Sequence, residues 1–267
     1  MGEAVDHFAP DGSTVYIGNF GAQLFALGHE LIRREVRNLD VVIASGGILL
    51  DQLIGAGNLR SAVFGHCWSP VGPSPAHNFR RAAQGGEGST VFHEMSLGHI
   101  TAALTGGAWD VPFMTAPGLP GTGFADEDWS KGYLDTASTT FGDATIVRSI
   151  RPDVAFVHVD TADFDGNGLI RGPLGEVLVA AQAARYVILV AENVVGDDSV
   201  VAAGPTIPGI LVDAVVHHPG AVAPDGVIGR YERDVAAYQA YTRAASTPEG
   251  FAAWLTELRL AGGLAHA

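Results

Sequence analysis

Side chains that could bind a metal ion occur together in the segment TADFDGNGLIRGPLGE, residues 161–176. Asp163, Asp165 and Asn167, followed by a glycine, have the spacing of the first ligands and the turn glycine of a helix–loop–helix calcium site. Such a loop also needs a bidentate glutamate at its last position, where this chain has a leucine. The preceding residues DVAFVHVD favour a strand, although the calcium site requires a helix. We therefore expect a strand that ends in a tight turn, and no metal ion.

The segment HEMSLGH, from His93 to His99, combines two histidines with a glutamate. Zinc proteases carry two histidines one helical turn apart, but these two are six residues apart and would lie on different faces of a helix. Glu94 falls where a strand is expected to end and a helix to begin, and ligands often bind at such junctions in open α/β sheets. A glutamate there could instead serve only to interact with the helix dipole. Position alone does not separate these two interpretations.

Two glycine-rich segments could bring backbone amides to a ligand. GNFGAQ, residues 18–23, follows the first expected strand, and its glycines allow a close approach to an anion or a carbonyl oxygen. GLPGTG, residues 118–123, has the wrong glycine order for a dinucleotide site and no Walker lysine, so we interpret it as a loop over a cleft. Cys67 lies between His66 and Trp68, but a lone cysteine beside a strand end is more often a small core residue than a nucleophile.

The composition is that of an acidic globular protein. Of 267 residues, 47% are hydrophobic and 16% are charged, which predicts a sizeable core. The formal net charge of −14 argues against nucleic acid or an anionic membrane surface as a partner. The sequence contains no bilayer-spanning apolar stretch and no signal-peptide pattern, and its single cysteine fits a reducing compartment. We expect a soluble cytoplasmic protein with one domain over residues 1–267.

Short apolar runs alternate with amphipathic stretches along most of the chain. LDVVIAS, residues 39–45, is a continuous apolar run of the kind found in strands that are buried on both faces. GAQLFALGHELIRREV, residues 21–36, has leucines and isoleucine at helical spacing. The alternation predicts an α/β fold with a mostly parallel sheet flanked by helices. Two amphipathic helices, over residues 230–245 and 247–261, are expected to end the chain as a helical tail.

Several segments together resemble the α-subunit of class I coenzyme A transferases, and in particular that of glutaconate CoA-transferase. They are GNFGAQLFALGHELIRR, LLDQLIGAGNLRSAVFG, RPDVAFVHVDTADFDGNGLIRG, AARYVILVAENVV and HHPGAVAPDG, which is followed by YERD. The resemblance covers nearly the whole chain in order. It implies the fold of that family, in which the Asp-Gly-Asn turn is structural and binds no metal.

The resemblance also implies half of a two-chain enzyme. Such enzymes move CoA between an acyl-CoA thioester and a carboxylic acid, with no cofactor apart from the CoA of the substrate. Their covalent thioester forms on a glutamate of the β-subunit, so a β-subunit is the expected partner, in a heterodimer or heterotetramer. The similar segment Ala191–Val194 lacks the glycine of the nucleophile motif, so Glu192 is not assigned that role. The family's backbone amides correspond to Asn19, Phe20 and Gly21.

A second resemblance concerns Glu94. The α-subunits of related steroid ring-opening hydrolases have a glutamate at the matching place, where it is a candidate for activating water toward a cyclic β-dicarbonyl CoA thioester. Glutaconate transferase α-subunits carry one too, so the residue does not separate the two activities. Both relatives place a carboxylate-binding arginine where this chain has Pro117. We take Glu94 as the catalytic candidate and His93, Gly118 and Gly121 as further substrate-binding candidates.

Overall fold

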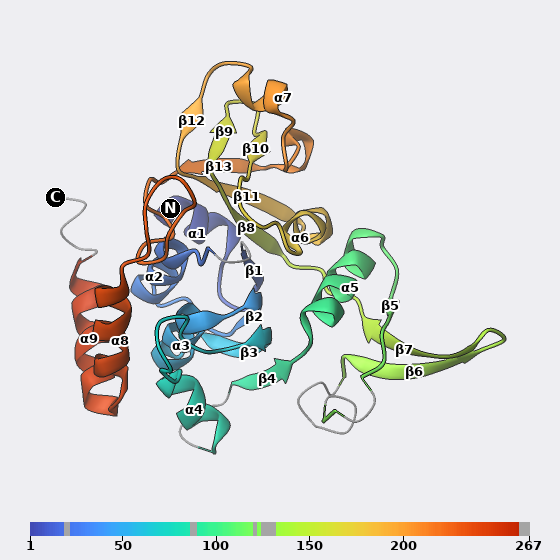
Figure 1. The fold of residues 1–267 in the computed structure, drawn as a ribbon, viewed down its shortest axis with the longest axis horizontal. Helices are drawn as coiled ribbons and strands as arrows, with labels where there is room; N and C mark the ends of the chain where they lie inside the picture. Colours follow the sequence, from blue (N-terminus) through green and yellow to red (C-terminus); the bar gives the residue numbers. More distant parts are fainter. Residues whose placement is uncertain (19–21, 86–89, 120–121, 124–131, 262–267) are drawn as a thin grey trace.

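A parallel sheet of seven strands runs through the middle of the molecule (Figure 1). The structure, a computed structural model, describes residues 1–18, 22–85, 90–119, 122–123 and 132–261. The sheet has the order β13-β11-β8-β1-β2-β3-β4, and each strand pairs with its neighbours in parallel. The strands are β1 (Thr14–Gly18), β2 (Leu39–Ser45), β3 (Leu59–His66), β4 (Val91–Glu94), β8 (Val154–Val159), β11 (Tyr186–Ala191) and β13 (Ala214–His217).

The strand order places a topological switch point between β1 and β8. The chain adds β2, β3 and β4 on one side of β1 and then returns to add β8, β11 and β13 on the other side. All the carboxyl ends therefore lie at one edge of the sheet. In open parallel sheets this edge, at the switch point, is where ligands bind.

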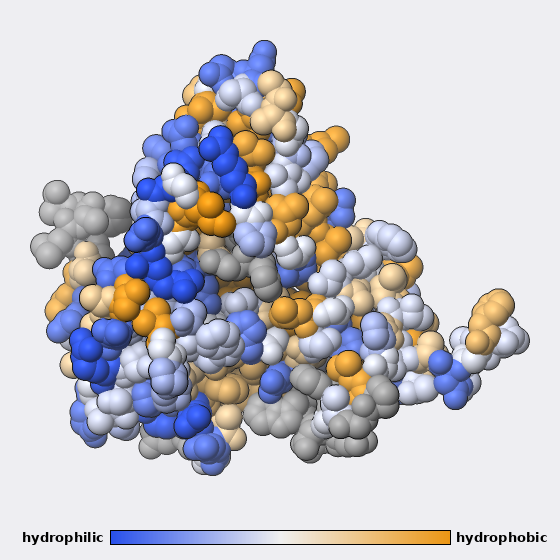
Figure 2. All heavy atoms as spheres, viewed as in Figure 1, coloured by the Kyte–Doolittle hydropathy of each residue, from blue (hydrophilic) through white to orange (hydrophobic). Residues whose placement is uncertain are grey.

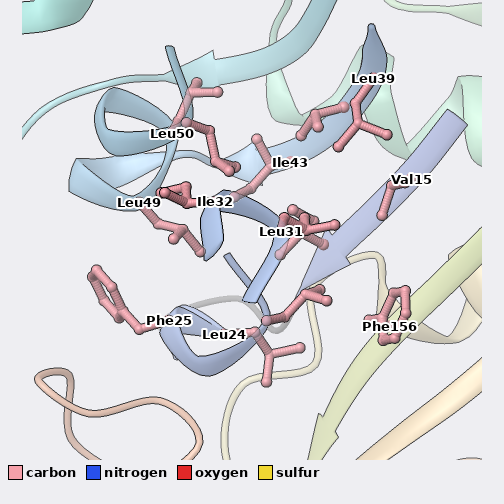
Figure 3. Packing of buried hydrophobic residues seen from close by; sticks show 14 of the residues in the cluster. Val15, Leu24, Phe25, Leu31, Ile32, Leu39, Ile43, Leu49, Leu50 and Phe156 are labelled. Carbon is pink, nitrogen blue, oxygen red and sulfur yellow. The ribbon is translucent and has the colours of Figure 1, made fainter. Parts of the chain in front are cut away.

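Helices cover both faces of the sheet because successive residues of each strand point to opposite faces. The described helices are α1 (Gly2–Phe8), α2 (Phe25–Arg33), α3 (Gly47–Ala56), α4 (His77–Ala83), α5 (Leu97–Ala108), α6 (Val177–Ala183), α7 (Ser199–Ala203), α8 (Val235–Ala245) and α9 (Pro248–Ala261), with a 3-10 turn at Gly209–Leu211. Of these, α7 packs on β9 and β10, and α8 and α9 pack on other helices. Val15 and Ile17 of β1 enter a cluster with α2 and α3, whereas Tyr16 enters a second cluster with α5 and α6. Figure 3 shows the first cluster, in which Phe156 of β8 also takes part.

A buried carboxylate ties the C-terminal helices to this core. Asp51 of α3 accepts hydrogen bonds from the hydroxyl of Tyr241 in α8 (2.6 Å) and from the backbone N–H of Phe79 in α4 (2.8 Å). The side-chain amide of Asn78 donates a third hydrogen bond at 3.1 Å. The predicted helical tail is therefore packed on the sheet domain.

The Asp-Gly-Asn segment forms a hairpin turn, as predicted. It joins β9 (Thr161–Asp163) to β10 (Gly168–Leu169), which form a three-stranded sheet with β12 (Val194–Val195). The carboxylate of Asp163 accepts from the backbone N–H groups of Asp165 (3.0 Å) and Asn167 (2.8 Å), and from the Asn167 side chain (2.9 Å). Its oxygens are thus used within the turn, and nowhere in the described ranges do three His, Cys, Asp or Glu residues gather as metal ligands.

A hairpin arm projects from the side of the molecule where the main sheet ends at β4 (Figure 1). It consists of β6 (Leu134–Thr139) and β7 (Gly142–Arg148), and β7 also pairs with β5 (Phe113–Ala116). Figure 2 shows apolar surface at the tip of the arm, where the Phe141 side chain is 100% exposed. Within the part of the chain that the structure describes, no helix is long and apolar enough to span a bilayer.

Candidate active site

Glu94 is the last residue of β4, at the carboxyl edge of the sheet, where it pairs with Phe64 of β3. Its side chain is partly buried, and this burial raises the pKa of the carboxyl above its usual range. Many other acidic side chains of the chain accept hydrogen bonds or form ion pairs. The Glu94 carboxylate forms no hydrogen bond or salt bridge with any described residue. A carboxylate that is uncommitted and has a raised pKa is suited to act as a base.

The start of helix α5 does not depend on Glu94. Ser96 is the N-cap residue, and its hydroxyl oxygen accepts from the backbone N–H of His99 at 3.1 Å. Glu94 lies two residues before that cap and remains in the strand. The strand-to-helix junction predicted from the sequence is therefore confirmed, whereas the interpretation of Glu94 as a helix-dipole residue gains no support.

His93 and Glu94 leave opposite faces of β4. The His93 ring lies against Tyr133, with the ring centroids 4.8 Å apart. Phe92, which shares a face with Glu94, packs on Phe64 and Phe79 at 6.1 and 5.2 Å. The structure thus does not bring the two adjacent candidates into one pocket, and the role of His93 in substrate binding stays a prediction.

The glycine- and proline-rich loop begins close to the same edge. His99, in the first turn of α5, contacts the carbonyl oxygen of Pro117 through Nε2 at 2.9 Å. This bond holds Pro117 and the exposed Gly118 near the start of α5, which directly follows β4. Gly121, and the candidates Asn19, Phe20 and Gly21 after β1, lie outside the described residues.

A buried acid pair at the switch point was missed by sequence reasoning. The Tyr16 hydroxyl donates to Glu176 at 2.8 Å, and both side chains are buried. Burial raises the pKa of the Glu176 carboxyl despite the hydrogen bond from Tyr16. A Cβ atom at Gly18 would collide with the Tyr16 hydroxyl, so only glycine fits at the end of β1. In the sequence, this pair could have been found only from Glu176, the acidic residue directly before the apolar run of α6.

Glu192 and Cys67 are both held in structural roles. The Glu192 carboxylate accepts from His158 Nε2 (3.1 Å), the Tyr231 hydroxyl (2.6 Å) and the Gly220 N–H (2.8 Å). Burial opposes its ionisation, yet the hydrogen bonds from His158 and Tyr231 lower the pKa of Glu192 to about 2, so it is a weak base. Burial raises the pKa of the Cys67 thiol well above its usual range, which makes Cys67 a poor nucleophile.

Comparison with known proteins gives consistent matches. The family model described as coenzyme A transferase matches residues 1–218. The A-subunit of 3-oxoadipate CoA-transferase from Pseudomonas knackmussii is 32% identical over 257 residues, which cover 96% of this chain and 90% of that protein. The cholesterol ring-cleaving hydrolase IpdA subunit of Mycobacterium tuberculosis is 27% identical over 255 residues, covering 90% of this chain and 85% of that one.

The fold matches as well. The crystal structure of glutaconate coenzyme A-transferase from Acidaminococcus fermentans superposes with a TM-score of 0.87, at 23% identity, over 96% of this chain and 86% of that chain. The predicted α/β architecture, with a parallel sheet between helices, is therefore confirmed.

Proposed function

Because this chain belongs to the coenzyme A transferase family, we propose that it works as one half of a two-chain enzyme that moves coenzyme A between an acyl-CoA thioester and a carboxylic acid. Its sequence and fold match those of transferase A-subunits, and that name implies a second subunit. The observation that carries the proposal is the 32% identity with one such A-subunit over 96% of this chain.

The proposed chemistry divides the work between the two chains. On the second chain, a glutamate carboxylate attacks the thioester carbonyl carbon, and the CoA thiolate leaves with the electron pair of the C–S bond. Backbone amides at positions 19–21, together with Gly118 and Gly121, would donate hydrogen bonds to substrate oxygens. The attack gives a mixed anhydride between the acyl group and the glutamate; the returning thiolate attacks its glutamyl carbonyl, which releases the first acid and leaves a CoA thioester on the second chain. The acceptor carboxylate then attacks this thioester, and the thiolate returns to the acceptor's acyl carbon, which releases the new acyl-CoA and the free glutamate. No cofactor is needed, and we place the enzyme in the cytoplasm with its acyl-CoA substrates.

A hydrolase is the second candidate function, and the state of Glu94 favours it. Glu94 has a raised pKa and makes no hydrogen bond with the described residues, as a general base would require. In this reaction Glu94 takes a proton from water, the hydroxide adds to a ring carbonyl of a cyclic β-dicarbonyl CoA thioester, and the C–C bond breaks. The carbon that leaves is stabilised by the neighbouring carbonyl and takes up a proton. The 27% identity with a ring-cleaving hydrolase subunit supports keeping this candidate.

Borohydride trapping separates the two functions. The chain is purified with its second subunit, incubated with a panel of acyl-CoA thioesters that includes 3-oxoadipyl-CoA, and treated with borohydride, which reduces an enzyme thioester to an alcohol. Peptide mass spectrometry should find the reduced glutamate on the second subunit, only when acyl-CoA was present. A reduced Glu94 or Glu192 would contradict the assignment of the nucleophile to the second subunit. Release of CoA or ring opening with neither chain modified would support the hydrolase.

A further inference from the structure

His66 and Glu94 lie on adjacent strands at the carboxyl edge of the sheet, on the same face. It ends β3, which runs beside β4 (Figure 1), and it follows Phe64 by two residues. Phe64 is the register partner of Glu94, and side chains two apart on a strand share a face. A Cβ atom built on the intervening Gly65 would collide with Leu97 of α5, which places α5 on the opposite face. His66 and Glu94 therefore project from adjacent strands on the same face of the sheet, at its carboxyl edge.

The ring of His66 is held in place but has no hydrogen bond within the described chain. The Trp68 ring lies against it, with centroids 5.3 Å apart and an interplanar angle of 38°. Nδ1 of His66 is buried without a hydrogen-bond partner, whereas Nε2 is not buried in this way. Burial lowers the pKa of the imidazole, so the ring is neutral at pH 7 and carries one N–H.

Two other histidines of this chain indicate which nitrogen carries that proton. His99 and His158 also enclose Nδ1 without a partner, and both contact an oxygen through Nε2, namely Pro117 O at 2.9 Å and a Glu192 oxygen at 3.1 Å. An enclosed N–H without an acceptor is rarer in proteins than an enclosed acceptor without a donor. We assign the proton of His66 to Nε2, because a proton on the enclosed Nδ1 would have no acceptor. Its outward nitrogen is then a donor.

We propose that His66 is a substrate-binding residue whose Nε2–H donates a hydrogen bond to the carbonyl oxygen of the acyl-CoA thioester. This rests on the proposed function, because the carbonyl oxygen becomes negative when the thioester is attacked. A donor that is already oriented stabilises that charge most in the transition state. The neutral ring supplies the N–H without adding a positive charge that would pair with Glu94.

Substitution in the two-chain enzyme tests the donor role. His66→Phe keeps a flat ring against Trp68 but removes the donor, and we expect kcat with 3-oxoadipyl-CoA to fall by about 10²–10³-fold with little change in KM. His66→Gln restores an N–H donor and should recover activity to within about 10-fold of the wild type. Full activity in the Phe variant would overturn the proposal. Equal loss in both variants would show that the ring acts as a base, and would overturn it too.

His218 provides the matched control. It is also partly buried with an enclosed and unpartnered Nδ1, but it follows β13, five strand positions from β3. At about 4.8 Å per strand this is about 24 Å away, so His218→Phe should leave kcat and KM unchanged. Loss of activity in that variant would show that replacing such a ring disturbs the sheet in general, and the His66 result would no longer support a donor.

Ring ¹⁵N NMR of the histidines tests the same proposal without relying on turnover. His66 should be neutral with Nε2 protonated, and its Nε2–H signal should move when 3-oxoadipyl-CoA is added without an acceptor acid, while His218 stays unchanged. Protonation at Nδ1, or no response to the thioester, overturns the proposal. If trapping fails to label the second subunit while this response is present, the transferase assignment fails and the His66 contact stands.

Discussion

Replacement of Glu94 by glutamine gives the sharpest test of the candidate site. The glutamine keeps the shape of the side chain at the end of β4 but cannot accept a proton. In the hydrolytic reaction, in which Glu94 takes a proton from water, the wild-type enzyme should lose kcat/KM as the pH falls through the raised pKa of the Glu94 carboxyl, and the variant should lack this acidic limb. Removal of a general base lowers kcat by about 10²-fold or more, which equals about 2.7 kcal/mol of activation free energy.

The stability of the Glu94→Gln variant should stay the same or rise, although its activity falls. Burial disfavours the ionised carboxylate in the folded chain, so Glu94 reduces stability as the pH rises through its folded-state pKa. Glutamine does not ionise and loses no hydrogen bond to a described residue, and the cap of α5 is made by Ser96. We therefore expect an equal or higher Tm for the variant at pH 7, together with unchanged assembly with the second subunit.

Glu249→Gln is the matched control, since Glu249 lies in the first turn of α9, where a negative charge interacts favourably with the helix dipole. This change should reduce stability by less than about 1 kcal/mol and leave kcat intact. Both variants are measured for kcat, KM, pH dependence and Tm in the two-chain enzyme. Full activity of Glu94→Gln, or a loss of activity that follows a loss of Tm, would refute the assignment of Glu94 as a base.

Two further changes test the structural carboxylate and the arm. Glu192→Gln should lower the free energy of unfolding of the isolated chain by about 3 kcal/mol, since it weakens hydrogen bonds to a buried charge. In the wild type, the Glu192 carboxylate has its pKa lowered from 4.5 to about 2, so it stabilises the fold fully above pH 4.5 and loses this effect toward pH 2. The free energy of urea unfolding should therefore depend less on pH in the variant over that range. An equal dependence on pH in the two proteins would contradict this. We also expect the second subunit to cover the apolar tip of the arm, because exposed apolar patches mark interaction sites. Phe141→Asp should then weaken binding of the second subunit by at least about 10-fold and leave the isolated chain unchanged. Ile210→Asp, at a side chain 95% exposed on another part of the surface, is the control, and equal affinities of the two variants would show that the arm is no anchor.

The sequence predicted the elements that the core requires. LDVVIAS and its counterparts were recognised as strands because burial on both faces leaves a continuous apolar run, and the strand that ends at Glu94 was recognised from the change of pattern into α5. The strand Leu134–Thr139 was missed, since most of its residues are exposed and show no apolar alternation. Helix α1 was also missed, because only Ala4 and Val5 of its seven residues are buried.

The side-chain arrangement of the site was harder to predict. Alternation along a strand already implies that His93 and Glu94 face opposite ways, but the two were proposed together because they are adjacent in the sequence. That His66 and Glu94 share a face at the same edge depends on the pairing of β3 with β4, two strands that are separate in the sequence, and neither strand's own pattern reveals it. Likewise, the three donors around Glu192 come from segments up to 39 residues away, so only the fold shows that this carboxylate is occupied.

The exposed arm also has a consequence for how cells produce this chain. Its tip carries a wholly exposed phenylalanine, and in the described part of the small sheet β5 and β6 each pair with β7 alone, which leaves an open strand edge on either side. Uncovered edges and apolar tips of this kind associate with other copies. Copies translated in excess of the second subunit are therefore expected to aggregate or to be degraded. If the second subunit covers the arm, the yield of enzyme should follow the scarcer of the two chains, and balanced translation of their genes should raise it.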